Sequence, residues 1–364
     1  MAIAITNPNS SKAYVFAENA EDLTVTGLST SLNVTIAVYL HGASVASFEL
    51  TPNPASASVV VRFREILNAI LPRITCTVPS TTSSYFNAVY VRATQGNTYV
   101  ETSTIYCFRG GFDAHETSFS NTTHWLTWKP QVTRTYPWAS EVISFIKPKL
   151  TSRTIYAKIY FSNGTSSTVT LGTFSSSPTN TQETVCSVNC SYSRIKGFSS
   201  AANKTVLAYD VYGGDILAHR FIVKPTRLRQ REFLFVNSLG VLDTAFATGD
   251  VSRDTESEMA TARISGQDVE LTNYAVEHFK VSTGGLRKRR DMDQWQDFFR
   301  STDRWVLLQG DDPRRIVIDS IESEMTEHKL SGVSFTYHYA DRFSGRHYSD
   351  TALPAFDYDN YEND

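Results

Sequence analysis

The chain has 364 residues, which is enough for two or three domains with apolar cores of their own. Hydrophobic residues make up 41% of it and charged residues 20%, a balance that excludes an intrinsically disordered chain. The formal net charge of −3 at pH 7 gives no long-range attraction to nucleic acid or anionic lipid, so neither is an expected partner.

Residues 1–110 predict a small β-sandwich with one short helix. Alternating apolar and polar side chains predict strands at 23–28, 32–40, 44–50, 85–93 and 98–108. Residues 63–71 instead place apolar side chains at helical spacing, and Pro72 is expected to end this helix. Gly96 and Asn97 fit the turn of a final hairpin.

A second β-sandwich is predicted for residues 111–225. It begins with an irregular, tryptophan-rich segment at 112–139, and strands are predicted at 141–148, 153–174 and 204–223. Hairpin turns are predicted at Asn163-Gly164 and Gly213-Gly214. Two sandwiches of similar length would fit a divergent duplication, although the sequence has no fixed-period repeat.

Residues 226–347 predict an α+β domain in which one helix packs on a curled sheet. Strands are predicted at 231–250, as a hairpin around Leu239-Gly240, and at 269–283, 304–310, 314–325 and 330–343. A helix is expected at 291–301, with Asp291 as its N-cap and Trp295, Phe298 and Phe299 on one face. Residues 348–364 are acidic and lack apolar periodicity, which predicts a flexible tail.

The C-terminal third resembles a family of proteins encoded by phages and prophages of Bacteroidetes bacteria. The matching segments, at 233–251, 281–301, 304–310 and 314–341, carry an aromatic-rich strand with Asn-x-x-Gly, a Thr-Gly pair, a tryptophan-containing helix and a final strand ending in Tyr-Ala-Asp. Residues 59–67 resemble the N-terminal domain of the same family. The resemblance implies a tail-associated virion protein whose last domain has a tail-tube-like fold, a β-sandwich flanked by a helix. It implies no defined site residues.

No motif in the sequence indicates catalysis or cofactor binding. It contains no dinucleotide-binding or P-loop pattern, no nucleophile elbow and no HExxH, so we expect no enzyme activity, no cofactor and no metal. None of the eight histidines has zinc-ligand spacing with another histidine or a cysteine. His338 and His347 lie near Asp341, but strand-face or surface histidines are commoner than catalytic ones. Cys186 and Cys190, the only close cysteine pair, are interpreted as structural.

The strongest charge cluster is the basic run of Arg287, Lys288, Arg289 and Arg290. Its alternatives are a solvated loop before a helix and a contact with an acidic neighbour or with DNA. In a ring of subunits, we favour pairing of this run with the acidic turn of Asp311 and Asp312, or with the 357–364 tail, of the next subunit. DNA binding is disfavoured by the acidic net charge.

A group of aromatic residues in the irregular segment is the other candidate contact surface. It consists of Phe112, Trp125, Trp128, Tyr136 and Trp138. Such rings can bind carbohydrate or a partner protein, or pack between the two sandwiches, and we favour interface or inter-domain packing.

No signal peptide or transmembrane helix is expected, because the N-terminus has no basic region and no run of roughly 18 apolar residues occurs. We expect a structural component of a bacteriophage virion, assembled in the host cytoplasm as a ring with other tail proteins. The alternative is a tail fibre or adhesin module that binds a receptor or bacterial surface glycan. A glycan hydrolase would need a pair of facing carboxylates, and no pair stands out in the sequence.

Overall fold

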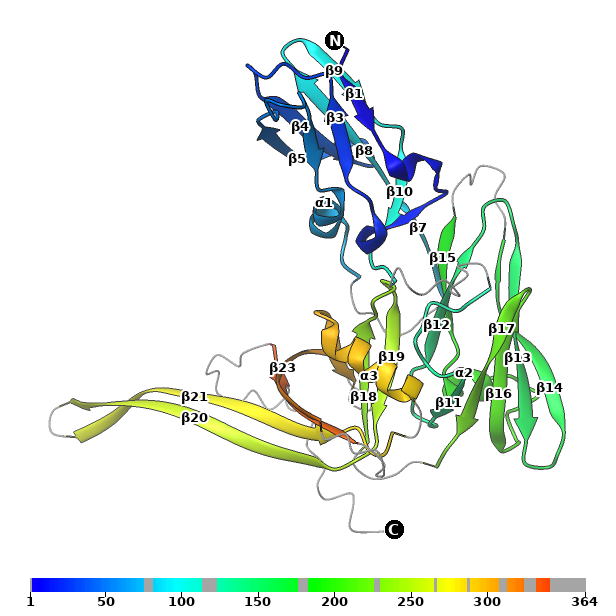
Figure 1. Cartoon of the computed structure of the whole chain (residues 1–364). Helices are drawn as coiled ribbons and strands as arrows, with labels where there is room; N and C mark the ends of the chain where they lie inside the picture. The colour runs from blue at the N-terminus through cyan, green and yellow to red at the C-terminus, as the bar shows by residue number, and fades with distance from the viewer. Residues whose placement is uncertain are drawn as a thin grey trace.

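A computed structural model describes residues 2–74, 81–112, 123–175, 183–225, 230–264, 267–286, 289–307, 313–323 and 332–340. Across these residues the chain is mainly β, and its strands form five sheets in several packed units (Figure 1). The predicted mainly β, multidomain fold is confirmed.

The first unit is a two-sheet sandwich closed at one end by a helix. One sheet has the order β1-β3-β6; the other has the order β2-β10-β8-β4-β5, with β9 paired to β8. The strands are β1 (Ala4–Thr6), β2 (Val15–Phe16), β3 (Leu23–Thr26), β4 (Val34–Leu40), β5 (Ala43–Leu50), β6 (Val59–Val61), β8 (Asn87–Gln95), β9 (Thr98–Glu101) and β10 (Ile105–Phe108). Short 3-10 helices lie at η1 (Pro8–Ser11) and η2 (Ala17–Asn19). Along β4 and β8, alternate residues are buried in the core between the sheets, as the sequence pattern predicts.

Helix α1 (Phe63–Ile70) buries Phe63 and Leu67 in the core of the first unit. Its C-cap is Leu71, so the helix ends before Pro72 as predicted. The hairpin at Gly96 is also confirmed, because Gln95 of β8 pairs with Thr98 of β9.

Strand β7 (Thr82–Tyr85) leaves the first unit and joins a sheet of the second. It pairs with β15 (Thr184–Asn189), with Tyr85 opposite Thr184, in a sheet of order β12-β15-β7. The predicted domain boundaries stay predictions. The sequence pattern gave no sign of this strand, because the pairing joins segments about a hundred residues apart.

The second unit stacks that sheet on a five-stranded sheet of order β11-β17-β16-β13-β14. Its elements are β11 (Val132–Thr135), β12 (Val142–Lys147), β13 (Arg153–Phe161), β14 (Ser166–Phe174), α2 (Tyr192–Lys196), β16 (Val206–Gly213) and β17 (Ile216–Val223). The predicted hairpins at Asn163-Gly164 and Gly213-Gly214 are confirmed by the β13–β14 and β16–β17 pairings. Every residue of β12 is buried, which fits a strand covered on both faces.

The third unit is a seven-stranded sheet of order β19-β18-β22-β23-β24-β21-β20. Its elements are β18 (Arg231–Val236), β19 (Leu242–Ala247), β20 (Val251–Ile264), β21 (Gln267–Ser282), α3 (Arg289–Arg300), β22 (Arg304–Leu307), β23 (Arg314–Ser323) and β24 (Val333–Tyr339). Helix α3 packs Trp295 and Phe298 onto the sheet core, and Phe299 lies at its edge, as predicted. Asp291 is not the N-cap: the helix begins at Arg289, and Asp291 lies in its first turn.

One apolar cluster joins the three units, and we call it the central cluster. Its members are Phe16, Phe86, Phe108, Leu126, Ile146, Val185, Leu239 and Val241. The backbones of the first and third units also meet here, where Gly111 N–H donates to Ser238 O at 2.7 Å. Gly240 has φ +79°, and a Cβ at this position would overlap the carbonyl oxygen of Arg109. This close approach requires glycine at the turn of the β18–β19 hairpin.

Candidate functional site

The most distinctive surface of the chain is a long two-stranded arm made by β20 and β21. The strands have 14 and 16 residues and pair from Val251↔Val281 at the base to Ile264↔Gln267 near the tip. Figure 1 shows this arm extending far from the rest of the chain. At about 3.4 Å per residue, strand β20 is roughly 45 Å long, against the five or six residues of a typical strand.

Only the base of the arm has a further β partner among the described strands. Strand β24 pairs with residues from His278 to Ser282 of β21, whereas β20 is an edge strand bonded to β21 alone. An isolated two-stranded ribbon is marginally stable in water, and a long edge strand offers unpaired backbone N–H and C=O groups to other chains. These properties are typical of an element that is completed by a partner.

Three side chains converge on the outer face of the sheet at the base of the arm, and we call them the His-Asp-His triad. They are His278 of β21, Asp319 of β23 and His338 of β24. The two imidazole Nδ1 atoms lie 2.9 Å and 2.6 Å from the two oxygens of Asp319. His278 and His338 are a cross-strand pair, and a register shift between Ile318 and Ser320 places Asp319 beside both.

Further charged groups surround this triad. Glu256 Oε2 of β20 lies 3.6 Å from His278 Nε2, and Asp254 is the cross-strand partner of His278. The cation on the same face, Lys280, is paired with Glu322 at 2.8 Å. The triad side chains are about a quarter exposed, so solvent reaches them.

Sequence reasoning missed the triad because it depends on strand register. Alternation places His278 on one face of its strand, but it does not say which residue lies opposite. His338 was considered with Asp341 and His347, both of which lie outside the described residues. The residues next to His338 in the sequence do not indicate that His278, 60 residues earlier, lies beside it in the sheet.

A second polar cluster is buried where the second unit meets β19, and we call it the buried ion cluster. Lys129 Nζ lies 2.7 Å from Glu141 Oε2 and 3.0 Å from Asp243 Oδ1, and all three side chains are almost fully buried. Burial alone would lower the pKa of Lys129, but the Asp243 and Glu141 carboxylates raise it above its usual value. Thr244 and Thr127 add hydrogen bonds to Glu141 and Asp243, at 2.8 Å and 2.6 Å. The cluster fixes one unit on another and has no opening to solvent.

The predicted basic run and acidic turn fall mostly outside the described residues. Arg287, Lys288, Asp311 and Asp312 are not described, and the side chain of Arg289 is not described either. Arg290 is exposed in the first turn of α3, where a positive charge opposes the helix dipole. Pairing of the run with the acidic turn of a neighbour stays a prediction.

The predicted aromatic surface is engaged in packing within the chain. Trp125 lies in the core of the second unit and donates from Nε1 to Leu217 O at 2.8 Å. Trp128 donates from Nε1 to Ser238 Oγ of the third unit at 2.7 Å. Tyr136 and Trp138 stack on each other and meet Phe246 of β19 edge-on. Trp128, Tyr136 and Trp138 therefore join the second unit to the third.

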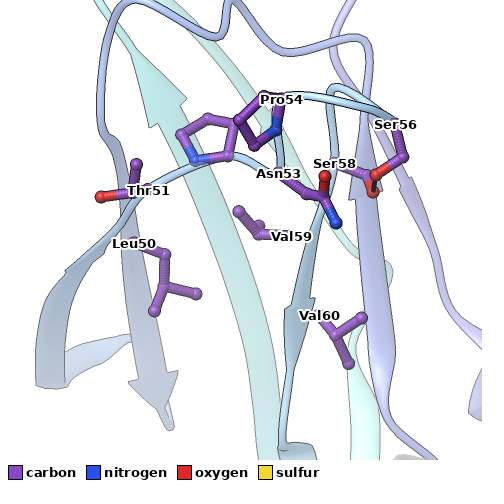
Figure 2. Close-up of a pocket in the computed structure, with 9 residues that line it drawn as sticks. Leu50, Thr51, Asn53, Pro54, Ser56, Ser58, Val59 and Val60 are labelled. Carbon is purple, nitrogen blue, oxygen red and sulfur yellow. Dashed lines mark hydrogen bonds between the residues drawn. The ribbon is translucent and has the colours of Figure 1, made fainter.

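A pocket lies at the edge of the first sandwich, between β5 and β6 (Figure 2). It has a volume of about 690 Å³. Its lining is made of Leu50, Thr51, Pro52, Asn53, Pro54, Ser56, Ser58, Val59 and Val60. Its lining holds no carboxylate, histidine or lysine that could serve as a general acid or base.

Comparisons with known proteins place the chain in no established family. No family model matches it, and no curated protein matches it. A chain from the solved structure "Virion of native gene transfer agent (GTA) particle" is similar over 30% of this chain and 91% of its own length. The identity is 12% and the TM-score is 0.22, a likeness too low to support an argument about fold or function. The resemblance to the Bacteroidetes phage family thus gains no support and stays a prediction. In the described part of the chain, no helix is long and apolar enough to span a membrane.

Proposed function

We propose that this chain is a structural protein of a bacteriophage virion, which assembles with copies of itself into a ring in the tail. The resemblance of the C-terminal third to tail-associated proteins supports a location in the tail. Within the tail, we propose that the chain is a distal tail, baseplate or tail-adaptor protein. The arm of β20 and β21 supports assembly, and it is the observation that carries the proposal. Other tail proteins are the expected neighbours of the ring, and the virion is the expected location.

The arm suits assembly because a stable ribbon needs a further strand, and no described strand pairs with the outer part of the arm. Strand β20 presents a free backbone edge of 14 residues, so a strand of the next subunit can extend the sheet there. If each arm lies on the next subunit, the contact is head-to-tail, and such contacts close into rings when the rotation between neighbours allows it. In a closed ring every arm pairs with a neighbouring subunit, so no arm leaves its strand edge open to uncontrolled aggregation.

Shortening the arm is expected to abolish assembly while leaving the three units folded. Residues 257–275 are replaced by Asn-Gly, which joins the cross-strand pair Glu256 and Val276 by a two-residue hairpin turn. Sedimentation velocity should give a ring-sized particle for the full chain and a monomer for the shortened chain. The dissociation constant for assembly should rise at least a hundredfold.

The matched control changes the tip of another hairpin. His41 sits at the β4–β5 turn with φ 50°, a conformation that asparagine adopts readily, so His41→Asn should assemble as the full chain does. Unchanged circular dichroism and thermal midpoints would show that the shortened chain is folded. If the shortened chain is folded and still forms the ring, the arm is not needed for assembly and the proposal is contradicted.

A further inference from the structure

We propose that the His-Asp-His triad is a binding site for a divalent transition-metal ion, with Zn²⁺ as the best-fitting ion. His278 Nδ1, His338 Nδ1 and the Asp319 carboxylate are the ligands. This site is independent of the assembly role, because it rests on side-chain chemistry at the base of the arm and not on any subunit contact.

The distances between the ligand atoms are close to those that a bound ion requires. One ligand atom from each residue lies within 4.8 Å of the other two. In a tetrahedral zinc site with Zn–N and Zn–O bonds of about 2.0–2.1 Å, ligand atoms lie about 3.3 Å apart. The His278 and His338 Nδ1 atoms lie 2.9 Å and 2.6 Å from different oxygens of Asp319, and each contact needs to widen by well under 1 Å to reach that separation. Side-chain rotation alone can supply such a shift.

The position of the triad on the sheet makes it preorganised. Each ligand comes from a different one of three adjacent strands, so the backbone ladders fix the spacing of the Cα atoms. The cross-strand pairing of His278 with His338 holds the two rings side by side, with centroids 5.7 Å apart. Asp319 sits at the register shift in β23, which turns its carboxylate towards both rings.

The charges around the triad favour a cation. Asp319 faces both imidazoles, Glu256 lies on the far nitrogen of His278, and Asp254 is opposite His278 on the edge strand. Lys280, the cation on the same face, is already engaged by Glu322. A divalent ion would therefore offset an excess of negative charge on this face.

The ligand set selects the class of ion. Imidazole nitrogen suits zinc, copper, nickel and iron, whereas Mg²⁺ and Ca²⁺ prefer sites made of oxygen alone. Three protein ligands leave a fourth coordination position for a water molecule. The triad is partly exposed, so water can reach that position. A bound ion would tie β21 to β23 and β24 and so fasten the arm to the body of the sheet.

Zinc titration of the full chain tests the site. Equilibrium dialysis against Zn²⁺ at pH 7.5 should give one tightly bound ion per chain. His338→Gln and Asp319→Asn should each weaken that binding at least tenfold, and the His278→Ala, His338→Ala double variant at least a hundredfold. His41→Asn, which alters an exposed histidine elsewhere, should bind zinc as the unmodified chain does.

A second readout keeps the result independent of folding defects in the variants. In imidazole ¹⁵N spectra of the unmodified chain, zinc should shift the Nδ1 resonances of His278 and His338 together, at one equivalent. Full-strength zinc binding by the double variant would overturn the proposal. So would absence of zinc binding to the unmodified chain at micromolar concentrations, or shifts confined to other histidines.

Discussion

Replacing Lys129 by methionine is expected to be among the most destabilising single changes in the chain. The substitution leaves the carboxylates of Glu141 and Asp243 facing each other in a site where neither is exposed to water. Removing one partner from a buried ion cluster typically costs about 3–5 kcal/mol, because the remaining charges keep their desolvation penalty. Urea unfolding should show this loss as a lower midpoint for the transition that separates the second unit from β19.

The matched control breaks an exposed ion pair of similar length. Lys12 Nζ lies 2.8 Å from Glu21 in the first unit, where both side chains are well exposed to water, so Lys12→Met should cost under about 1 kcal/mol. Adding Glu141→Gln and Asp243→Asn to Lys129→Met should restore part of the lost stability, since these changes remove the uncompensated charges. Equal costs for Lys129→Met and Lys12→Met would show that the cluster does not hold the units together.

Replacing Glu232 by glutamine is expected to stabilise the chain at pH 8 and to have little effect near pH 4.5. Burial raises the pKa of Glu232 from 4.5 to about 8; the Ser140 N–H, which donates to it at 2.7 Å, lowers it in part. The folded state therefore holds a proton that the unfolded state has released, and stability falls as pH rises from 4.5 to 8. The rise in pKa from 4.5 to about 8 corresponds to a loss of stability of at most about 5 kcal/mol, because each pKa unit is worth about 1.36 kcal/mol. Glutamine keeps an acceptor oxygen for the Ser140 N–H, and because it does not ionise, it removes this loss of stability at high pH.

Unfolding of both proteins across this pH range gives the measurement. The difference in stability between Glu232→Gln and the unmodified chain should grow steadily from pH 4.5 to 8 and then level off. Glu65→Gln, which changes an exposed glutamate paired with Arg62, should show no such growth. A constant difference at all pH values would mean that Glu232 has an ordinary pKa in the folded chain.

Local patterns predicted most strands and turns, because each is encoded within a few adjacent residues. Strand β4 buries alternate residues, as residues 32–40 indicate, and α1 ends before Pro72 for the steric reason that the sequence gives. Strand β20 was missed because Val251–Ile264 is mostly polar and lacks the apolar alternation of a core strand. Asp291 was misplaced by the cap rule because the helix extends two residues further toward its N-terminus.

Contacts between distant segments could not be predicted in the same way. The buried ion cluster brings Lys129 to Asp243 across more than a hundred residues, and no local pattern marks either as buried. The triad needs the register of three strands, which alternation leaves open. The aromatic residues of 112–139 were identified as a contact surface, and the structure packs Trp125, Trp128 and Tyr136 against the second and third units. Phe112 instead packs on Phe16 of the first unit.

The central cluster and the buried ion cluster make a firm body from which the arm extends. Eight apolar side chains from all three units meet in the central cluster, and the ion cluster adds a polar contact between the second and third units. A rigid body that carries one long ribbon can hold that ribbon in a fixed direction, which repeated subunit contacts require.

Cryo-electron microscopy of the purified full chain tests assembly through the arm most directly. The expected result is a closed ring in which the β20–β21 ribbon of each subunit lies on the next subunit. Particles containing a single chain at every concentration tested, with the ribbon free in solvent, would contradict it.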